Sequence, residues 1–494
     1  MSKFETSNNM SINCSRVIGI QFSILSPDEI RKGSVAEITS RDTYINNKPV
    51  IGGLFDPRMG VLEPGLICPT DGLDYMQTPG YAGHIELARP VFYIQYLSTI
   101  QKCMKCVCFK CSKLLISKEK YKEALKMPGS VRWKYVFDLC SKVKRCGDDS
   151  EDGCGNLQPF KIRKVDLATI IAEWKNDNGG ENIVIKVTPE MLLKNFKRIS
   201  DDDVSFMGFS PIYSRPDWMI CQVMSVPPPA VRPSVKHDAQ QRSEDDLSHI
   251  LVNIIKTNKI LQDKIQNNAT GDIIDGWTTM LQYYVATQVD NKIPGSAPVA
   301  QRSGRPLKSI KDRLNGKGGR MRGNLMAKRV DFSARSVISA DPNISIRELG
   351  VPMKVAKNIT KPVIVNKINK AFLTKLVQNG ADVWPGAKML EKKNGEVITL
   401  RYYLDRNSIN LEEGDTIHRH MMDGDAILFN RQPTLHRMSM MCHIARIMKR
   451  GDTFRMNVAD TKPYNADRNF VTIKVTSRQG WQQGALKNVL PSSK

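Results

Sequence analysis

The stretch QRSGRPLKSIKDRLNGKGGRMRGNLMAKRVDFSAR, residues 301–335, carries the densest positive charge of this 494-residue chain. It holds eleven Lys and Arg residues against two Asp residues, with five glycines spread among the cations. Arginine offers a planar fork of donors to phosphate oxygens, and glycine lets a backbone approach a phosphate closely. Aromatic residues are scarce here, so phosphate contact is favoured over base stacking. A solvated basic loop without a ligand is the alternative.

The rest of the chain shares this basic character. Lys and Arg total 73 against 50 Asp and Glu, a formal net charge of +23. Such an excess favours a polyanionic partner, because each neutralised phosphate releases a counterion. Nucleic acid is favoured over a membrane surface, since no basic amphipathic helix with an aromatic face is present. No apolar run approaches the ~18 residues of a membrane span, and no secretory signal is recognisable, so we expect a soluble, intracellular protein.

Eleven cysteines are present, and six of them lie between Cys103 and Cys146. An odd number without a secretory context argues against a disulfide framework and favours zinc. The four residues Cys108, Cys111, Cys146 and Cys154 form a CxxC pair and a downstream pair that suit a closed tetrahedral zinc site. A second CxxC, formed by Cys103 and Cys106, could replace the first. Buried or free thiols are the remaining alternative.

Two segments show helical periodicity. Residues 189–205 place apolar side chains on one face. Residues 243–265 begin with a possible N-cap, Ser243, and with acids in the first turn. The apolar faces of the two expected helices are Leu192, Leu193 and Phe196 in the first, and Leu247, Ile250, Leu251, Ile254 and Ile255 in the second.

Other segments are typical of loops and short strands. A Lys-rich stretch, KEKYKEALK at 118–126, favours helix. The segment 225–235 contains three consecutive prolines, which remove amide donors, so we expect an extended connector. Residues 290–305 are rich in Gly, Pro and Ser and favour a loop. From about 336 to 470, short β-like runs alternate with turns.

The stretch from residue 304 to 343 resembles the switch region of the largest, β′-like subunit of eukaryotic-type multisubunit DNA-directed RNA polymerase. Further motifs of that family follow the same order along the chain, so the resemblance covers residues ~15–467. They are FDPRMG (55–60), GHIELARPVF (83–92), CVCFKCSKLL (106–115), GCGNLQP (153–159), SRPDWMI (214–220), VPPPAVRPS (226–234), EDDL (244–247), NGADVWPGAK (379–388) and LFNRQPTLHRMSMMCH (428–443).

The resemblance implies a mixed α+β, multidomain fold: a clamp with a zinc knuckle, followed by a partial double-psi β-barrel. Residues 1–204 would form the clamp core and clamp head with the zinc site. Residues 205–335 would hold the dock, lid, rudder and switch-like basic segments. Residues 336–470 would form the incomplete active-site barrel, and residues 471–494 a tail that resembles nothing in the family.

The resemblance also assigns binding residues. The clamp zinc falls on the four cysteines named above. A further family zinc, held by Cys-x2-Cys and Cys-x2-His, would lie at positions 68–81, where Cys68 is followed by Asp71, Thr78 and Tyr81, so we expect no zinc there. His84 is expected to be a structural hydrogen-bonding residue. The switch residues expected to contact DNA are Arg313, Lys317, Arg320, Arg322, Lys328, Arg329 and Arg335.

The family catalyses nucleotidyl transfer with Mg²⁺ held by three Asp of one loop, NADFDGD. This chain has Asn465 and Asp467 at the start of the motif, and then Arg468 and Asn469 where the sequence of carboxylates should continue. We expect Asp467 to supply only part of a magnesium site. The pair Asp423 and Asp425 lies before the barrel strand and is expected to be a turn rather than a metal site.

Two further residues match nucleotide contacts of the family. Arg431, in NRQP, matches a residue near the ribose of the incoming nucleotide, and Asn465 matches the one that contacts the 2′- and 3′-hydroxyls. Asp467, Asn465 and Arg431 are therefore the expected catalytic residues. A salt-bridged core arginine and a turn asparagine are the alternatives.

The resemblance implies DNA-templated transcription together with the second-largest and smaller subunits. Further partners would be template DNA, the RNA–DNA hybrid and nucleoside triphosphates, with no membrane partner; zinc and Mg²⁺ would be the cofactors. The alternative is a non-catalytic, zinc-containing DNA-binding fragment, since the motif breaks after Asp467; an intron read as coding or a frameshift would cause such a break. An unrelated DNA-binding protein would require the ordered motifs to be coincidence. The expected location is the nucleus, or a viral factory or virion for a viral host.

Overall fold

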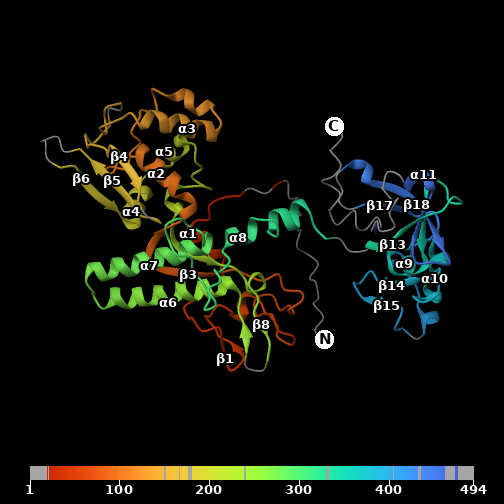
Figure 1. Cartoon of the computed structure of the whole chain (residues 1–494). Helices are drawn as coiled ribbons and strands as arrows, with labels where there is room; N and C mark the ends of the chain where they lie inside the picture. Colours follow the sequence, from red (N-terminus) through yellow and green to blue (C-terminus); the bar gives the residue numbers. More distant parts are fainter. Residues whose placement is uncertain are drawn as a thin grey trace, which may run out of the picture. The chain divides into compact units, whose positions relative to one another are not determined.

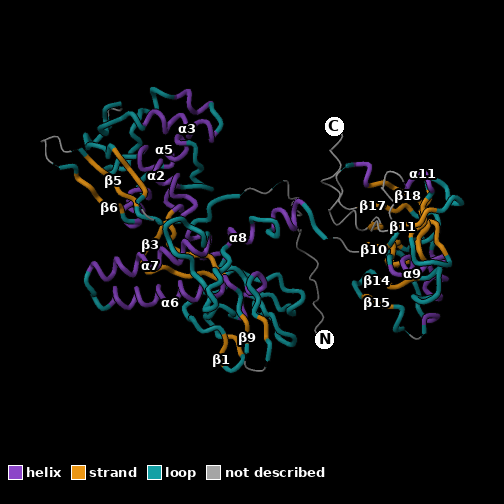
Figure 2. Tube along the Cα trace, in the orientation of Figure 1, coloured by secondary structure: helices purple, strands orange, loops and turns teal. Residues whose placement is uncertain are grey.

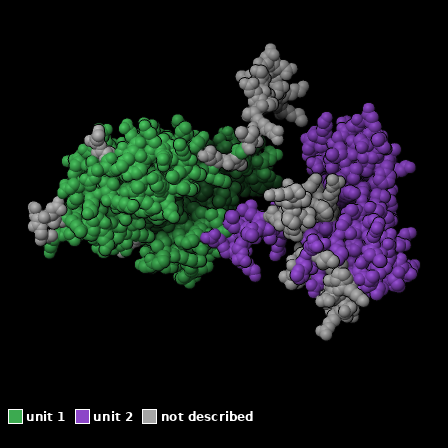
Figure 3. Space-filling view, turned by 90° about the horizontal axis from the view of Figure 1, so that it is seen from above, with its two compact units in different colours: residues 1–314 green, residues 315–494 purple. Residues whose placement is uncertain are grey.

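The computed structural model describes residue 19 and residues 22–149, 152–165, 167–175, 181–238, 241–329, 333–403, 405–431, 436–461 and 473–476. The chain divides into two compact units, Met1–Leu314 and Asn315–Lys494, coloured separately in Figure 3. No helix in the described ranges has the length and apolarity needed to cross a membrane. Each unit is built around its own hydrophobic cores.

One core of the first unit lies between a two-stranded sheet and a helical hairpin. Strand β3 (Gly83–Phe92) pairs antiparallel with β7 (Ile220–Val226), and both hairpin helices, α6 (Asp246–Gln266) and α7 (Gly271–Val289), pack against β3 (Figure 1 and Figure 2). The predicted apolar face of α6 is confirmed, since all five residues are buried. The predicted N-cap was wrong: Asp245 accepts the amide of Leu247 at 2.9 Å and caps the helix.

The second core of this unit joins four helices and a three-stranded sheet. Its elements are α2 (Leu97–Cys106), α3 (Gly129–Cys140), α4 (Pro189–Lys197), α5 (Asp201–Met207), β4 (Lys161–Lys164), β5 (Ile170–Trp174) and β6 (Ile183–Val187), with strand order β4-β5-β6. The single helix expected over 189–205 is wrong, because it is split into α4 and α5. Ser200 accepts the amide of Asp203 at 3.2 Å, and this N-cap starts a second helix.

Short elements complete the first unit. They are α1 (Pro27–Gly33), β1 (Tyr44–Ile45), β2 (Lys48–Pro49), β8 (Val235–Lys236), β9 (Arg242–Ser243) and α8 (Ile310–Leu314). The Lys-rich stretch forms only a 3₁₀ turn, at Lys122–Lys126. The proline-rich connector is extended as predicted, apart from a 3₁₀ turn at Pro229–Val231 and its end in β8.

The second unit contains a mixed, seven-stranded sheet. Its strands are β10 (Ser333–Ser336), β11 (Ile338–Ala340), β12 (Glu348–Pro352), β17 (Ala426–Arg431), β18 (Met440–Met448), β19 (Phe454–Met456) and β20 (Ile473–Thr476), in the order β10-β20-β17-β18-β12-β19-β11. The pairs β11–β19 and β12–β18 are parallel. Leu349, Val351, Phe429 and Phe454 are completely buried in its core.

A smaller antiparallel sheet and short helices accompany it. They are β13 (Thr360–Ile364), β14 (Ala387–Glu391), β15 (Val397–Thr399) and β16 (Thr416–His420), in the order β13-β16-β14-β15, with α9 (Met353–Asn358), α10 (Lys370–Asn379) and α11 (Val458–Thr461). The predicted basic loop also contains a π-helical turn, Met321–Met326.

The prediction of a mixed, multidomain α and β chain is confirmed. The described strands of the seven-stranded sheet have β10 and β11 at opposite ends of their order, so they do not form a closed barrel. Strand β20 lies within the expected non-family tail, 471–494, and pairs with both β10 and β17.

Candidate metal centre and nucleic-acid interface

The four predicted zinc cysteines come together in the first unit. Their sulfurs all lie within 4.8 Å of one another. The Sγ atoms of Cys108 and Cys154 are 3.6 Å apart, as are those of Cys111 and Cys146. A tetrahedral ion with Zn–S bonds of about 2.3 Å places its sulfurs about 3.8 Å apart, whereas a disulfide requires about 2.05 Å. The spacing therefore fits one tetrahedral metal ion.

Two tight loops present these sulfurs. In the first, after α2, the amide of Ser112 donates to Cys108 O at 3.1 Å, and Ser112 has a positive φ of 63°. In the second, the amide of Cys146 donates to Asn156 O, and the amide of Gly155 returns to Cys146 O at 2.9 Å. In the first loop the Lys110 amide also donates to the Cys108 Sγ at 3.4 Å. We call these two loops the first and the second knuckle.

The environments of the sulfurs differ. Cys108 and Cys146 are buried, and burial raises the pKa of the Cys146 thiol to about 12. Cys154 is exposed, and the backbone amide of Asn156 lowers the pKa of its thiol to about 7. Cys103, of the alternative CxxC, lies buried in α2 outside this group. A soft cation would stabilise all four thiolates, and zinc fits this donor set.

The residues at positions 68–81, where we expect no zinc, also lie close together, around the carboxylate of Asp71. Asp71 accepts hydrogen bonds from Thr78 Oγ1 at 2.8 Å and from Tyr81 Oη at 3.1 Å. Burial alone would raise the pKa of Asp71, but hydrogen bonds from the Leu73 amide and these side chains outweigh it and lower the pKa. Cys68 is buried and also contributes to lowering the pKa of Asp71. We call Cys68, Asp71, Thr78 and Tyr81 the Asp71 cluster, in which Thr78 and Tyr81 are hydrogen-bonded to the central carboxylate.

His84 lies in β3 and engages a neighbouring hydroxyl. Its Nδ1 is 2.7 Å from the Oγ of Ser34, and its ring is mostly buried. His84 therefore makes a hydrogen bond of the structural kind that we expect for it.

The basic segment consists of two chemically different halves. In the first, residues 301–314, acids of α6 and its surroundings engage the cations. Asp246 binds Arg305 at 2.8 Å and also accepts the Lys308 amide. Asp290 binds Lys311 at 2.5 Å. The guanidinium of Arg313 donates to Asp245 and, at 2.9 Å, to Val231 O. This half is held by ion pairs inside the first unit.

The second half, residues 315–329, presents its cations to solvent. Five predicted DNA-binding residues lie here and are exposed: Lys317, Arg320, Arg322, Lys328 and Arg329. Arg320 donates to the side chain of Asn324 at 3.0 Å. Within the described residues, none of the five forms an ion pair with a carboxylate. We call Lys317–Arg329 the exposed arm. Arg335 belongs to β10, opposite Lys474 of β20.

The predicted catalytic residues are only partly described. Arg431 is the last residue of β17, half-buried and opposite Ile473 of β20. Asn465 and Asp467 lie outside the described residues, so their predicted roles stay predictions.

The acids expected to form a turn do so. The carboxylate of Asp425 accepts two 2.8 Å hydrogen bonds from Arg419 and one of 2.9 Å from Lys361. Burial alone would raise the pKa of Asp425, but these cations outweigh it and lower the pKa to about 2. Asp423 accepts the Ile447 amide at 2.5 Å. Both carboxylates therefore serve the structure of the turn.

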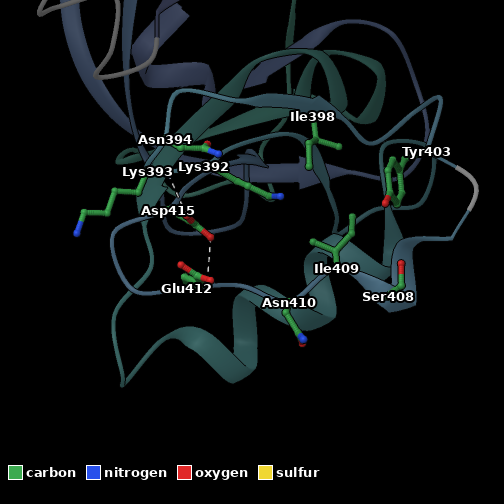
Figure 4. A pocket seen from close by; sticks show the side chains of 10 residues that line it. All are labelled: Lys392, Lys393, Asn394, Ile398, Tyr403, Ser408, Ile409, Asn410, Glu412 and Asp415. Carbon is green, nitrogen blue, oxygen red and sulfur yellow. Dashed lines mark hydrogen bonds between the residues drawn. The ribbon is translucent and has the colours of Figure 1, made fainter. Parts of the chain in front are cut away.

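A depression of about 620 Å³ in the second unit was not anticipated from the sequence (Figure 4). Its lining, which includes Lys392, Tyr403 and Asn410, comes from separate loops and contains no recognisable motif. The buried carboxylate of Asp415 accepts the amides of Lys393 and Glu412 at 3.1 and 2.9 Å. The carboxylate of Asp415 therefore shapes the loop.

Family comparison agrees with these observations. Residues 14–325 match the family model for RNA polymerase Rpb1, domain 1. Residues 327–469 match the model for RNA polymerase Rpb1, domain 2. The first match contains the four cysteines and most of the exposed arm, and the second contains most of the described seven-stranded sheet. The chain therefore belongs to the family of Rpb1, the largest subunit of DNA-directed RNA polymerase, a nucleotidyltransferase complex.

Proposed function

We propose that this chain serves as the largest subunit in DNA-templated transcription, with the second-largest subunit supplying the other half of the active-site cleft. The exposed arm carries the proposal most directly, because its cations are solvated and free of carboxylate partners in the described residues. Cations of this kind bind phosphates without reading sequence. Template DNA and the RNA–DNA hybrid are the proposed ligands of the arm.

The salt dependence of binding tests this role. The full chain should bind a labelled RNA–DNA hybrid with an affinity that falls linearly with salt on logarithmic axes. Replacing Lys317, Arg322 and Arg329 together by Ala should reduce the slope by about three, roughly one for each lost phosphate contact. A variant with Lys370, Lys375 and Lys392 changed to Ala is a matched control with equal charge loss elsewhere in the second unit. Equal slopes for the two variants would argue against the arm as the binding site.

The fold assignments of the family belong to the same proposal. Residues 1–204 are proposed as the clamp, 205–335 as dock, lid, rudder and switch segments, and 336–470 as the active-site barrel. The family matches over residues 14–325 and 327–469 support the family membership from which this division is taken. Cys108, Cys111, Cys146 and Cys154 are the proposed clamp zinc ligands, supported by their tetrahedral spacing.

Nucleotidyl transfer is proposed for the subunit within its complex. Arg431 and Asn465 would contact the nucleotide, and Asp467 would contribute to Mg²⁺ binding. Mg²⁺ prefers several oxygen ligands in octahedral geometry, and Asp467 is followed by Arg468 and Asn469. We therefore propose that this polypeptide alone binds catalytic Mg²⁺ poorly.

The second candidate is a non-catalytic, zinc-containing DNA-binding fragment, favoured by that same break in the motif. Sequencing the mature messenger RNA across the codon for Asp467 separates the two. A message that continues into FDGD favours the catalytic subunit, and a message that encodes Arg468 and Asn469 favours the fragment. Mg²⁺-dependent primer extension, with the second-largest subunit added, gives an independent answer.

A further inference from the structure

Two buried amide side chains outside the cysteine cluster hold the loop that carries Cys108. Asn195 of α4 donates through Nδ2 to Phe109 O at 2.9 Å and to Cys108 O at 3.2 Å. Gln158 donates through Nε2 to the Cys108 Sγ at 3.3 Å. We infer that Asn195 and Gln158 are positioning residues that hold the first knuckle in its metal-binding shape. This inference rests on the proposed zinc centre and assigns it supporting groups.

Asn195 lies at a buried position, where an amide side chain without hydrogen-bond partners would destabilise the fold. It lies on the buried face of α4, between Leu193 and Phe196, and is 7% exposed. A buried amide destabilises a protein unless its donors find acceptors. Its Nδ2 group reaches two consecutive carbonyls, so it fixes the orientation of the peptide between Cys108 and Phe109. The Cys108 side chain then leaves the backbone in one direction.

Gln158 connects the two knuckles. Its Oε1 accepts the Phe109 amide at 3.4 Å in the first, while its Nε2 also donates to Asn156 O at 3.1 Å in the second. Its donation to the Cys108 sulfur removes some negative charge from a thiolate that has little access to water. Hydrogen bonds of this type orient metal ligands and tune the metal.

An aromatic pair closes the same side of the cluster. Phe109 packs edge-on against Trp174 with ring centroids 5.4 Å apart, and Trp174 Nε1 donates to Leu157 O at 3.1 Å. Cys108 therefore lies behind amides and rings, whereas Cys154 faces solvent. Metal exchange should begin at Cys154, and the anchored Cys108 should be the last thiolate to leave.

Asn195 also links metal binding to a distant part of the chain. Helix α4 also packs against β3, so Asn195 connects the first knuckle to a helix that is docked on that strand. A ligand that binds only the ordered loop must also stabilise the docked helix. Metal occupancy should thus protect α4 from local unfolding.

Zinc release tests the inference. The full chain, loaded with zinc, is mixed with a chromogenic chelator, and release is followed with time. Asn195→Leu and Gln158→Met keep side-chain volume but lack the donors. Loss of such a support usually weakens metal binding about 10- to 100-fold, and each variant should release zinc faster in that range. Gln222→Leu is the matched control, because Gln222 binds Lys197 of α4 at 3.3 Å and does not touch the knuckles. It should release zinc at the wild-type rate.

Cobalt substitution separates the two roles. A hydrogen bond to sulfur stabilises its lone pairs, so its loss lowers the energy of the thiolate-to-cobalt absorption band. Gln158→Met should shift this band to longer wavelength. Asn195→Leu should leave it in place, since Asn195 contacts carbonyls and not sulfur. The spectral measurement also remains decisive for Gln158 if Asn195→Leu does not fold.

The outcomes are distinct. Wild-type release rates for both variants, with an unshifted cobalt band, would overturn the inference. A wild-type chain that binds neither zinc nor cobalt would instead refute the metal centre itself. Faster release for all three variants, Gln222→Leu included, would reveal general destabilisation and equally overturn it.

Discussion

Arg313 donates hydrogen bonds to the carboxylate of Asp245, the N-cap residue of α6, and to the carbonyl oxygen of Val231. The last cation before residue 315 is thus engaged within the first unit, while the exposed arm follows directly after it. The same sequence segment contains both an anchor and a solvated, positively charged surface.

This difference predicts that substitutions of Arg322 and Arg313 have different effects on nucleic-acid binding. Arg322→Gln should reduce the salt slope of hybrid binding by about one, as expected for a lost phosphate contact. Arg313→Gln should leave the slope unchanged, because its guanidinium is occupied by Asp245, and should speed proteolysis near residue 314. Binding titrations at several salt concentrations and limited proteolysis measure both effects. A reduced slope for Arg313→Gln would instead make it a phosphate ligand, as the family resemblance predicts.

The cysteine cluster predicts which exposed thiol matters for metal binding. Cys154→Ser should lower the zinc content from about one ion per chain toward zero, because a closed tetrahedral site requires four ligands. Cys442→Ser is the control, since Cys442 is also exposed but lies outside the cluster. Elemental analysis after gel filtration gives the stoichiometry. Equal zinc contents for the two variants would exclude Cys154 as a ligand.

Asp425 predicts an acid-labile ion pair. Asp425→Asn leaves Arg419 and Lys361 without their shared charge partner, and breaking such a buried pair costs about 3–5 kcal/mol. The folded pKa is about 2, below the unfolded value of about 3.9. The stabilisation is therefore complete above about pH 4 and is lost as pH falls toward 2. Denaturant unfolding at pH 7 and pH 3 should show a smaller difference between variant and wild type at the lower pH.

Burial of His420 predicts that acidification destabilises the protein at a higher pH than the titration of Asp425 does. Its ring is fully buried in β16, and burial, with Lys357 and Lys388 nearby, lowers its pKa to about 4. The unfolded pKa is about 6.5, so the unfolded state binds more protons between pH 6.5 and 4, and about 3 kcal/mol of stability is lost across that window. His420→Leu should remove this dependence. Unfolding curves from pH 7 to pH 4.5 test it, and parallel slopes for variant and wild type would contradict it.

We predict that three substitutions in the Asp71 cluster create a zinc site. Asp71, Thr78 and Tyr81 already converge beside Cys68. The triple change Asp71→Cys, Thr78→Cys and Tyr81→His provides the Cys-x2-Cys and Cys-x2-His ligands that the family resemblance implies. The zinc content should rise by about one ion per chain, since three cysteines and a histidine complete a tetrahedral site. An unchanged content in a folded variant would mean that the backbone at these positions is wrong for zinc.

The sequence predicted those features that depend on local spacing. Clustered cysteines favour zinc, but spacing alone leaves Cys103 and Cys106 as an alternative pair, and the family resemblance is what assigns Cys108, Cys111, Cys146 and Cys154. The buried face of α6 followed from its periodicity. Two helix boundaries were less predictable, because neighbouring polar residues compete for the N-cap position. They are the cap of α6, at Asp245 rather than Ser243, and the start of α5 after Ser200.

Other features depended on contacts between residues far apart in the sequence, which residue spacing does not reveal. Charge alone could not separate Arg313 from Arg322, because the partner of Arg313 lies far earlier in the chain. Asn195 looked like an ordinary polar residue on a helix, and only its contacts with Cys108 and Phe109 reveal a role. Similarly, Ile473–Thr476 match no family motif, yet they find partners in β10 and β17.

The pairing of strand β20 has a consequence for the stability of the sheet. The strand is paired along both edges, with β10 on one side and with β17 on the other. A substitution that breaks the backbone pairing of β20 therefore disturbs β10 and β17 together, so this four-residue strand is a sensitive point of the sheet.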